Sequence, residues 1–438
     1  MKKKSEVAVF WFRRDLRVED NAGLYHALKS GYPVLPLFIF DETILNQLED
    51  RKDRRVAFIH SAVEAVHHEL ATFDSSLFVK SGEVNQIWKE IVAEFDVKEV
   101  YTNHDYELYA QKRDKQAGQM LNELGIPFYT FKDQVIFEKN EILNNNGGPY
   151  TVFTPYSRKW KEKLNDFFLK PYPVHQYIRQ LLKLEPLEIP SLAAIGFESA
   201  PVDFKRPVLD EELIIEYHVM RDIPSVKGTS QLSVHLRFGT ISIRKLASLG
   251  LKLNETWLNE LIWRDFYMNI LWHFPHINEG RSFKKDYDNI KWRNNTEEFE
   301  RWCNGTTGFP IVDAGMRELN ATGFMHNRVR MITASFLCKD LLIDWRWGEA
   351  YFANKLMDFD FSANNGGWQW ASGSGCDAAP YFRIFNPDAQ TQKFDKDLKY
   401  IRKWIPEYGT PDYPQPVVDH KTARDRTLAA YKKALEKG

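Results

Sequence analysis

Short apolar runs alternate with amphipathic stretches in the first third of the chain. The runs have the length and composition of buried strands, and the stretches between them repeat apolar residues at helical spacing. Strands that alternate with helices predict an α/β domain with a doubly wound, Rossmann-like parallel sheet, here over residues 1–130. The predicted strands are Val7–Phe12, Val34–Phe40, Leu77–Val79 and Val97–Thr102, and the predicted helices are Arg54–Leu70, Val84–Phe95 and Tyr109–Leu124.

Two changes of pattern follow this domain. Residues 131–208 are rich in proline and contain an Asn-Asn-Asn-Gly-Gly-Pro turn and one helix-like piece, Tyr156–Phe168, so we predict an interdomain linker. Over residues 209–438 nearly every segment has helical periodicity and none alternates convincingly like a strand, which predicts an all-α domain. The clearest helical segments there are Leu258–Trp272, Ile311–Leu319, Arg328–Leu342, Trp347–Phe352 and Thr422–Glu436.

Length, charge and cysteine content narrow the class of protein. A chain of 438 residues with 43% hydrophobic residues exceeds the size at which one core divides, in agreement with two domains. A formal net charge of −1 excludes a generally basic nucleic-acid coat, although a local stripe of Arg and Lys would suffice for binding. Three cysteines without a C-x-x-C pair favour a reducing compartment. The first apolar run is too short for a signal sequence or a membrane span, so we expect a cytoplasmic protein with no membrane partner.

Tryptophan is concentrated in the helical domain. Nine of the thirteen tryptophans lie from Trp257 to Trp370, although Leu, Ile and Val fill cores with fewer steric demands. Indoles also carry electrons, so this clustering indicates a redox cofactor. The first predicted strand lacks a following G-x-G-x-x-G segment and ends in Arg13-Arg14-Asp15-Leu16-Arg17. We therefore expect the cofactor outside the α/β domain.

Two groups of polar residues in the first half of the helical domain are candidates for a site. Gly228–Ser233 places three hydroxyls before a helix, where they suit phosphate oxygens or act as an N-cap with turn residues. Glu260, Trp263 and Arg264 share one helical face. That face suits a nucleobase, or it is a partly solvated face with a long arginine.

Two further groups lie nearer the end of the chain. Asn327 and Met331 are one helical turn apart among basic residues, and they form either a site or a structural polar cluster, with His326 structural. The segment from Asp358 to Trp368 predicts a loop whose glycines let the backbone approach a neighbouring group closely, or an N-cap with turn glycines. Its acids lack the spacing of a calcium loop and no His accompanies them, so we predict no metal site.

Five segments of the chain match motifs of a known family. Together they resemble the photolyase/cryptochrome flavoproteins, and most closely the cyclobutane-pyrimidine-dimer (CPD) DNA photolyases of the microbial type. The resemblance spans almost the whole chain and is most specific from about Tyr217 to Pro387. The segments are VFWFRRDLRVEDN, KGTSQLS, WLNELIWRDFY, GFPIVDAGMRELNATGFMHNRVRMITASFLCKDLLIDWRWGE and ANNGGWQWASGSGCDAAPYFRIFNP.

The resemblance implies a U-shaped FAD inside the helical domain. Arg330 would pair with Asp358 beside the isoalloxazine, Asp360 would accept a hydrogen bond from a ring N–H, and Asn364 would face flavin N5. A neutral amide at N5 is typical of photolyases, because an acid there could protonate N5 and divert the anionic hydroquinone. The implied contacts to the phosphates and ribitol come from Tyr217, Thr229, Ser230 and Ser233. The implied chain of tryptophans that photoreduces FAD is Trp368, Trp345 and Trp292.

The same resemblance implies light-driven DNA repair. Excited FADH⁻ would give an electron to a CPD flipped out of single- or double-stranded DNA, the ring would open, and the electron would return to the flavin. We expect a monomer that binds UV-damaged DNA with salt-sensitive affinity, because neutralised phosphates release counterions. Glu260 would stabilise the transient radical anion of the dimer only if it donates a proton or a hydrogen bond, which requires a raised pKa. The implied lesion pocket consists of Glu260, Trp263, Asn327, Met331 and Trp370, and the implied phosphate contacts are Arg221, Arg264, Arg328 and Arg383.

The chain departs from the family at the antenna site. Tyr109 and Ala110 stand where folate-binding relatives carry Asn and Glu, and Glu279 replaces a Lys. The sequence therefore disfavours methenyltetrahydrofolate in that mode and leaves three alternatives open: a deazaflavin, another flavin or an empty antenna cleft. The alternative function is a cryptochrome-type blue-light photoreceptor, which the intact lesion residues disfavour. This sequence has no recognisable nicotinamide site, which disfavours a flavin oxidoreductase. A (6-4) photolyase would carry His at the positions of Asn327 and Met331, so the sequence disfavours that activity as well.

Overall fold

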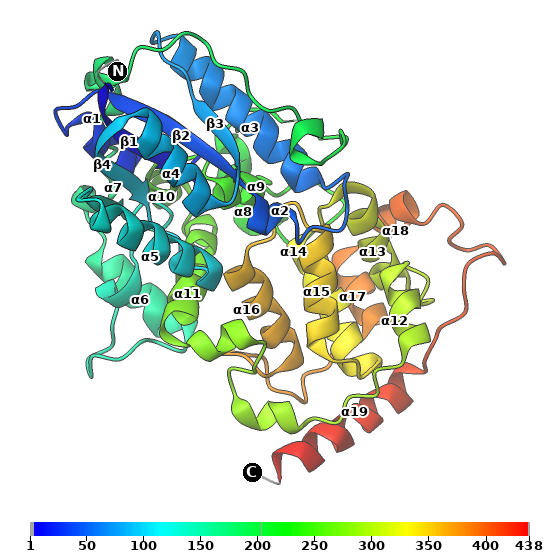
Figure 1. Ribbon diagram of the computed structural model, residues 1–438. Coiled ribbons are helices and arrows are strands. Elements are labelled where there is room, and N and C mark those ends of the chain that lie inside the picture. Colours follow the sequence, from blue (N-terminus) through cyan, green and yellow to red (C-terminus); the bar gives the residue numbers. More distant parts are fainter. Residues whose placement is uncertain (1–3, 203, 437–438) are drawn as a thin grey trace. The chain divides into compact units, whose positions relative to one another are not determined.

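The computed structural model describes residues 4–202 and 204–436, and the chain divides into two compact units (Figure 1). Each unit is assembled from separate stretches of the chain. Within the described ranges, no helix is both long enough and apolar enough to cross a membrane. Unit 1 is Met1–Glu138, Leu164–Leu209 and Leu232–Leu251, and unit 2 is Lys139–Lys163, Asp210–Gln231 and Lys252–Gly438.

Unit 1 is built on a five-stranded parallel sheet with the strand order β3-β2-β1-β4-β5. The first strand is central, and Ala8 pairs with Val34 on one side and with Glu99 on the other. This confirms the predicted doubly wound α/β fold, with strands β3 and β4 extending beyond their predicted ends and β5 not predicted. The strands are β1 (Glu6–Phe12), β2 (Val34–Asp41), β3 (Phe78–Gly82), β4 (Asp96–Asn103) and β5 (Phe128–Phe131).

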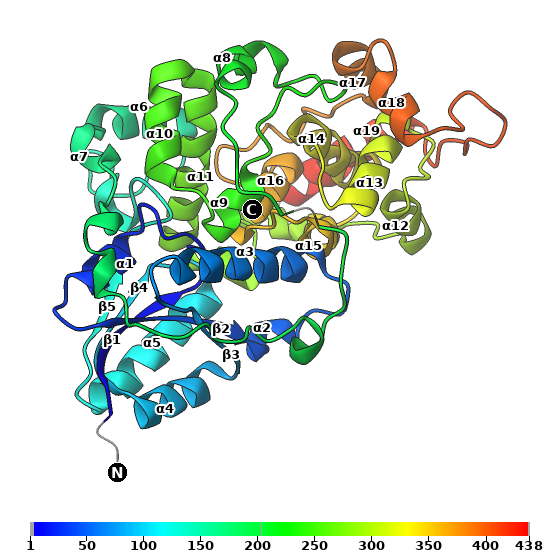
Figure 2. The same cartoon turned by 90° about the horizontal axis from the view of Figure 1, so that it is seen from above.

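Helices cover both faces of this sheet. Helices α4 and α5 pack their apolar residues, including Trp88 and Leu121, against Val9, Trp11 and Leu37 on one face. Figure 2 shows α3 on the other face. The unit 1 helices are α1 (Ala22–Leu28), α2 (Glu42–Leu45), α3 (Arg54–Ala71), α4 (Val84–Glu94), α5 (Leu108–Glu123), α7 (Asp166–Leu169), α9 (Ser233–Phe238) and most of α10 (Ile243–Leu253).

A buried ion-pair network joins α10 to the loops of unit 1. The Arg244 guanidinium lies 2.8 Å from carboxylate oxygens of both Asp20 and Asp133, and Arg17 lies 2.6 Å from Asp133. All four side chains are at least nine-tenths buried. These contacts explain why Leu232–Leu251 belongs to unit 1, although the sequence pattern places it in the helical domain.

Replacing Arg244 with methionine is expected to lower the free energy of unfolding by roughly 3–5 kcal/mol, because buried Asp20 loses its arginine partner and buried Asp133 keeps only Arg17. The adjacent Lys245 is the matched control. Its side chain is 53% exposed and lies 3.9 Å from Glu19, so Lys245→Met should change the stability by less than about 1 kcal/mol. Thermal and urea unfolding of both variants measures the difference. Equal stabilities would contradict a structural role for the network.

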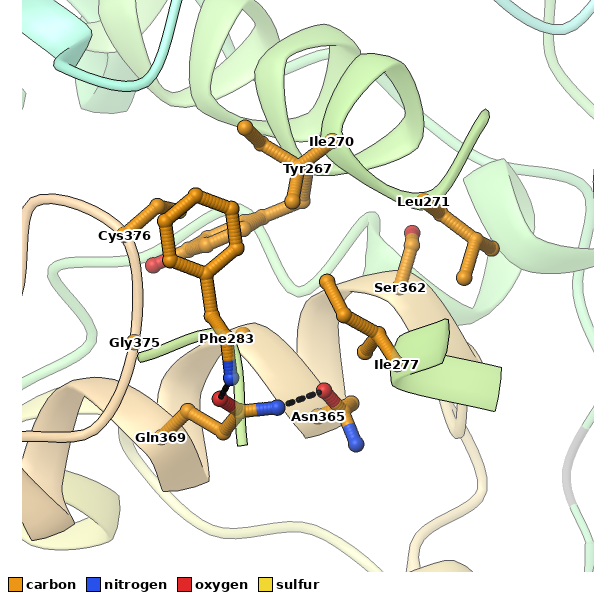
Figure 3. Close-up of a pocket in the computed structure, with 11 residues that line it drawn as sticks. Tyr267, Ile270, Leu271, Ile277, Phe283, Ser362, Asn365, Gln369, Gly375 and Cys376 are labelled. Carbon is orange, nitrogen blue, oxygen red and sulfur yellow. Dashed lines mark hydrogen bonds between the residues drawn. The ribbon is translucent and has the colours of Figure 1, made fainter. Parts of the chain in front are cut away.

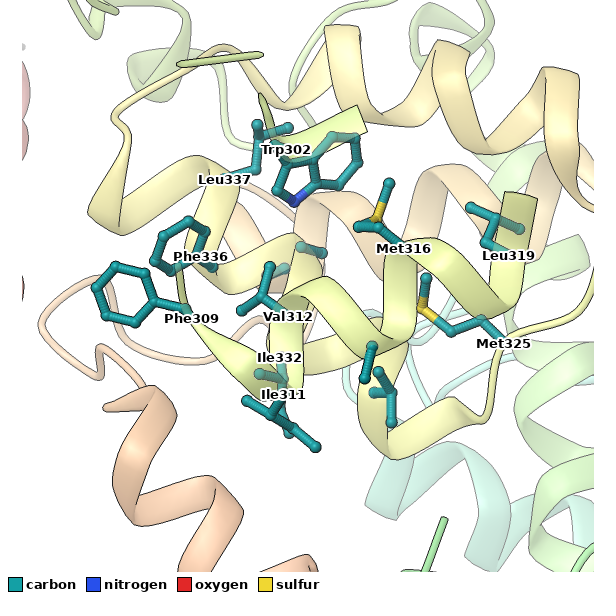
Figure 4. Close-up of a cluster of buried hydrophobic side chains, with 14 of the residues drawn as sticks. Trp302, Phe309, Ile311, Val312, Met316, Leu319, Met325, Ile332, Phe336 and Leu337 are labelled. Carbon is teal, nitrogen blue, oxygen red and sulfur yellow. The ribbon is translucent and has the colours of Figure 1, made fainter. Parts of the chain in front are cut away.

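Unit 2 is helical. Its core cluster around Trp302 joins α13, α14 and the tryptophan-bearing helices, and Figure 4 shows Trp302, Met316 and Met325 among its side chains. Trp160 of α6 donates a hydrogen bond to Asp265 of α11 at 3.0 Å, which places part of the predicted linker in this unit. The unit 2 helices are α6 (Phe153–Lys163), α8 (Glu211–Met220), α11 (Glu255–His273), α12 (Thr296–Cys303), α13 (Pro310–Thr322), α14 (Asn327–Ser335), α15 (Trp345–Lys355), α16 (Phe361–Ser372), α17 (Pro387–Phe394), α18 (Lys399–Trp404) and α19 (His420–Leu435).

Three sequence predictions in the helical regions were wrong in detail. The predicted helix Tyr156–Phe168 is two helices, α6 and α7, which belong to different units. The predicted helix Arg328–Leu342 is α14 followed by a π-helical turn at Phe336–Asp340, because π-turns share the apolar pattern of the helix they interrupt. The predicted loop around Asn364 is helical, since α16 begins at Phe361.

Candidate functional site

Side-chain caps fix the starts of the helices that carry the candidate residues. Asp360 caps α16 by accepting a hydrogen bond from the Ser362 backbone N–H at 3.1 Å. His326 caps α14 by accepting from the Arg328 N–H at 3.2 Å, which is the structural role expected for it. Burial lowers the pKa of His326 to about 4, so the ring is neutral at physiological pH. The two caps set where the polar faces of α14 and α16 begin.

The two glycines of α16 have different surroundings. A Cβ on Gly366 would lie 2.3 Å from the Tyr267 ring of α11, so glycine permits this close helix contact. Gly367 is exposed, and a Cβ there would meet no heavy atom within 4 Å in the described structure. Gly367 stands one turn after Asn364, on the same side of the helix. The prediction of a close approach is therefore confirmed at Gly366, where the neighbour is Tyr267.

A small pocket lies between α11 and α16 (Figure 3). Tyr267 and Ile270 line one side, and Gln369 lies opposite them. The Gln369 side chain accepts a hydrogen bond from the Phe283 N–H at 2.7 Å and donates one to Asn365 at 2.8 Å. None of the site residues predicted from the sequence lines this pocket.

Arg330 and Asp358 form a partly buried ion pair. Arg330 Nη2 lies 2.8 Å from Asp358 Oδ2, and Arg330 Nε donates to the Met325 carbonyl at 2.8 Å. The Asp358 side chain is only 7% exposed. Its second oxygen, Oδ1, is buried and has no hydrogen-bond partner among the described residues. A buried carboxylate oxygen in this state fits a ligand that donates a hydrogen bond.

Asn364 is held by a residue that the sequence analysis missed. Its amide donates to Glu349 Oε1 at 2.8 Å and to the Glu349 carbonyl at 3.1 Å. Burial raises the pKa of Glu349, and the hydrogen bond from Asn364 opposes that rise. The contact orients the amide with its oxygen away from Glu349. Glu349 is the last residue of the fourth motif segment, but nothing along the sequence pairs it with Asn364, 15 residues later.

Four alternating charges connect α8, α11 and α14. Arg221 Nη1 lies 2.6 Å from Glu260 Oε1, and Arg328 Nη2 lies 2.7 Å from Asp222 Oδ1. Arg221 Nε is 3.9 Å from the same Asp222 oxygen. Burial raises the pKa of Glu260, although Arg221 acts in the opposite direction. The structure thus brings Glu260 together with two of the predicted phosphate-binding arginines, through Asp222, which was not predicted.

The two indoles predicted for the lesion pocket lie on separate helices. Trp263, one turn after Glu260 on α11, stacks face to face on Phe153, with ring centroids 3.7 Å apart and an angle of 3°. Trp370 of α16 contacts Phe385 at 6.3 Å. The backbone of Phe153 is held by Asp377, which accepts a hydrogen bond from the Phe153 N–H at 3.0 Å. Phe153 is another residue that the sequence pattern did not indicate.

The other lesion-pocket and phosphate candidates are at or near the surface. Asn327 is exposed, and its amide lies 3.9 Å from the Met331 sulfur, one turn along α14. Arg383 is exposed and follows a turn in which its N–H donates to the Pro380 carbonyl at 2.9 Å. Arg264 is half-buried on α11. The geometry leaves room for DNA contacts at these positions.

The residues predicted to bind the phosphates and ribitol of FAD are distributed over both units. Tyr217, Thr229 and Ser230 are half-buried in unit 2, whereas Ser233 is exposed at the first position of α9 in unit 1. Gly228 is required by a close approach, since a Cβ there would lie 2.6 Å from the Met220 carbonyl oxygen. In the described structure no side chain caps α9. The simple N-cap interpretation of this segment was therefore wrong.

The three tryptophans predicted to carry electrons differ in burial. Trp368 and Trp345 are 2% and 1% exposed. Trp368 contacts Phe352 at 5.0 Å and Trp302 at 6.0 Å, and its buried indole N–H finds no acceptor in the described ranges. Trp292 is half-buried and lies edge-on to Tyr431, with centroids 6.0 Å apart. Two fully buried indoles and one that reaches solvent suit a path from the core outward.

Acidic, His and Cys side chains do not gather into a metal site. Over residues 4–202 and 204–436, no group of three or more of them has the geometry to hold a metal ion. The three cysteines are buried and unpaired.

Comparison with known proteins identifies the family. The family model described as DNA photolyase matches residues 8–176, and the model described as FAD binding domain of DNA photolyase matches residues 257–411. The chain is 38% identical to the deoxyribodipyrimidine photo-lyase of Vibrio cholerae over 97% of this chain and 99% of that protein. The chain belongs to the DNA photolyase family. The matched FAD-binding domain begins within α11 and extends past α18, and it contains the candidate residues from Glu260 to Arg383.

Solved structures of the family share the whole fold. The class III photolyase of Agrobacterium tumefaciens has a TM-score of 0.86 and 32% identity, covering 100% of this chain and 99% of that one. A cryptochrome of Synechocystis has a TM-score of 0.82 and 26% identity, covering 98% of this chain and 100% of that one. Both repair enzymes and cryptochromes of the photolyase family therefore share this fold, and the site residues must decide between the two activities.

Proposed function

We propose that this protein binds FAD and uses light to repair cyclobutane pyrimidine dimers in DNA. The observation that carries the proposal is the match to photo-lyases over nearly the whole chain, combined with an intact set of lesion-pocket residues. Bound FAD supplies the light-driven electron. The protein's part is to orient the lesion, exclude water and set the local charge.

The FAD site proposed from the structure centres on Asp358, Arg330 and Asn364. The unpartnered oxygen of Asp358 suits a hydrogen-bond donor on the flavin ring, and Arg330 lies 2.8 Å from the other oxygen of that carboxylate. Asn364 presents a neutral amide, and Gly367 keeps the same face of α16 open. The further contacts proposed are Asp360 to a ring N–H, and Tyr217, Thr229, Ser230 and Ser233 to the phosphates and ribitol.

The lesion site proposed uses the other polar faces of unit 2. Trp263 and Trp370 supply flat apolar walls for the flipped bases, and Glu260, Asn327 and Met331 supply their polar and soft contacts. The raised pKa of Glu260 supports a hydrogen bond from its carboxyl to a base carbonyl. The proposed phosphate contacts are Arg221, Arg264, Arg328 and Arg383. We expect the protein to act on damaged single- or double-stranded DNA as a cytoplasmic monomer.

The electron path proposed runs through Trp368, Trp345 and Trp292 to solvent. It would return the flavin to its reduced state without taking part in ring opening. The antenna chromophore stays unidentified: Tyr109 donates a hydrogen bond to Asp41 at 2.7 Å, and Ala110 is buried, so neither offers the contacts of the folate-binding relatives. Glu279 lies 3.3 Å from Arg281.

The test is repair of UV-irradiated oligo(dT). Protein with chemically reduced flavin should restore the thymine absorbance under blue light and leave it unchanged in the dark. FAD binding without recovery of absorbance would contradict repair and favour a photoreceptor.

Asn364→Asp is expected to weaken retention of the fully reduced flavin. The new carboxyl would lie beside Glu349, where two carboxylates cannot both ionise, so one stays protonated and can pass a proton to the flavin. Asn364→Ser, which is polar and neutral, is the control. Absorption spectra during aerobic storage in the dark measure the loss. If the Asp variant stores reduced flavin as long as the parent, this role of Asn364 is excluded.

A further inference from the structure

The ion pair between Arg221 and Glu260 joins two residues that the proposed function assigns to different parts of the DNA. Arg221 is proposed to contact a phosphate, and Glu260 a flipped base, yet their side chains lie 2.6 Å apart. The Arg221 side chain is 25% exposed and that of Glu260 is 34% exposed, so the pair is accessible to a ligand. The Arg221 guanidinium also lies 5.3 Å from the Tyr217 ring centroid, on the same helix.

A second ion pair of an arginine with a carboxylate is formed by Arg328 and Asp222, the residue after Arg221. Arg328 is paired with Asp222 at 2.7 Å, and Asp222 is the more exposed of the two, at 43%. Two of the four proposed phosphate-binding arginines, Arg221 and Arg328, are therefore paired with carboxylates of this chain. Phosphates that approach them add negative charge to a cluster that already contains two acids. Either the carboxylates stay ionised beside the phosphates, or one of them takes up a proton.

Glu260 is the carboxylate placed to take up the proton. Burial raises its pKa, and nearby Asp222 raises it further, whereas Arg221 lowers it. Arg264 follows one turn later on the same face of α11. Tyr217 from α8 and Tyr267 from α11 also face Glu260, and both stay neutral because burial raises their pKa values. A flipped base would remove more water from Glu260. The loss of Arg221 to a phosphate and the loss of water both raise the pKa of Glu260.

We propose that Arg221 exchanges Glu260 for a DNA phosphate when damaged DNA binds, and that Glu260 takes up one proton from solvent in the exchange. The inference rests on the proposed function, because it requires DNA at this site. The protein gains a proton, the guanidinium keeps its charge, and no bond other than O–H forms. Protonated Glu260 then donates a hydrogen bond to the base. Binding of a phosphate by Arg221 outside the pocket thus leads to protonation of Glu260 inside it.

The sign of the pH dependence follows from this exchange. The pKa of Glu260 is higher in the complex than in the free protein, so the added affinity is fully present below the free-protein pKa. It is lost as the pH rises through the pKa of the complex. The affinity for damaged DNA should therefore fall with increasing pH across that window, by at most about tenfold per pH unit for one proton.

Calorimetric titration of the oxidised holoprotein with an oligonucleotide that carries one CPD tests the proposal. Titrations at one pH in buffers of different ionisation enthalpy give the number of protons taken up, and repeating them from pH 5 to pH 8 locates the window. We expect net uptake by the parent, loss of that uptake in Glu260→Gln, and retention of it in Asp222→Asn. An undamaged oligonucleotide should cause less uptake, because no base enters the pocket.

Two results would overturn the inference. Binding without proton uptake at every pH would mean that Arg221 bridges Glu260 and the phosphate together. Equal uptake in the parent and in Glu260→Gln would place the proton elsewhere. The dependence of the parent's Kd on pH gives the same answer without a variant, so misfolding of Glu260→Gln would not remove the test. A protein that shows no proton uptake but still repairs CPDs refutes this inference alone, whereas absence of repair refutes the proposed function.

Discussion

Alanine in place of Asp358 is expected to lower the affinity for FAD by on the order of a hundredfold, or about 3 kcal/mol. The substitution removes the unpartnered oxygen proposed to bind the flavin ring and leaves the Arg330 guanidinium without its partner at 2.8 Å. Removing one member of a buried pair is more damaging than removing both, because the remaining charge is still shielded from water. We therefore also make a prediction for the FAD affinity of the double variant, in which both Asp358 and Arg330 are replaced by alanine.

A double-mutant cycle with Arg330→Ala separates the two effects. Fluorescence titration of FAD into the flavin-free protein measures the affinity of each variant. We expect Asp358→Ala and Arg330→Ala each to weaken binding, and the double variant to be less impaired than the sum of the two. Additive losses would mean that the pair does not act as a unit. An unchanged FAD affinity in Asp358→Ala would place the flavin elsewhere.

Trp368→Phe is expected to slow photoreduction of the flavin by about tenfold or more, or at least about 1.4 kcal/mol in the activation free energy. Phenylalanine fills most of the same core volume but is a much poorer electron donor than an indole. Repair by protein whose flavin is reduced chemically should be preserved, because the proposed tryptophan path only restores the flavin. Flavin absorbance under blue light with an external reductant measures the rate.

Trp302 provides the matched control for this variant. It is fully buried and lies 6.0 Å from Trp368, but it is not part of the proposed path. Trp302→Phe loses the hydrogen bond from its indole to the Thr333 carbonyl and should lower the stability, yet photoreduction should stay close to that of the parent. If both variants slow photoreduction equally, the effect of Trp368 is structural. If Trp368→Phe abolishes repair by reduced flavin too, the residue has a different role.

Strong local patterns in the sequence predicted most of the fold. Strands β1 and β2 were found because each is an apolar run that is buried along almost its whole length. The more polar strands β3 and β4 were found only in part, so their ends were missed. The fifth strand, Phe128–Phe131, was missed because it has only four residues, none of them fully buried. Helix α16 was taken for a loop because asparagine and glycine disfavour helices, and here the cap at Asp360 and the close contact of Gly366 with Tyr267 outweigh that preference.

Contacts between distant parts of the chain could not be predicted from local patterns. Residues 139–163 and 164–209 look alike in composition but join different units, because Trp160 reaches Asp265 in one unit and Tyr172 reaches Asp20 in the other. In the site, family motifs indicated Arg330 and Asp358 as a pair. Asp222, Glu349 and Phe153 act through neighbours that only the tertiary structure brings close, so no pattern along the sequence points to them.

The central claim is that this site repairs one class of DNA lesion with light absorbed by reduced flavin. The most direct measurement compares two otherwise identical oligonucleotides, one with a single CPD and one with a single (6-4) photoproduct, during illumination of the reduced holoprotein. Chromatography of the products at several wavelengths gives an action spectrum for each lesion. We predict conversion of the CPD to two thymines, with an action spectrum that follows the absorbance of the reduced flavin, and no conversion of the (6-4) lesion. Failure to convert the CPD, or conversion in the dark, would contradict the account.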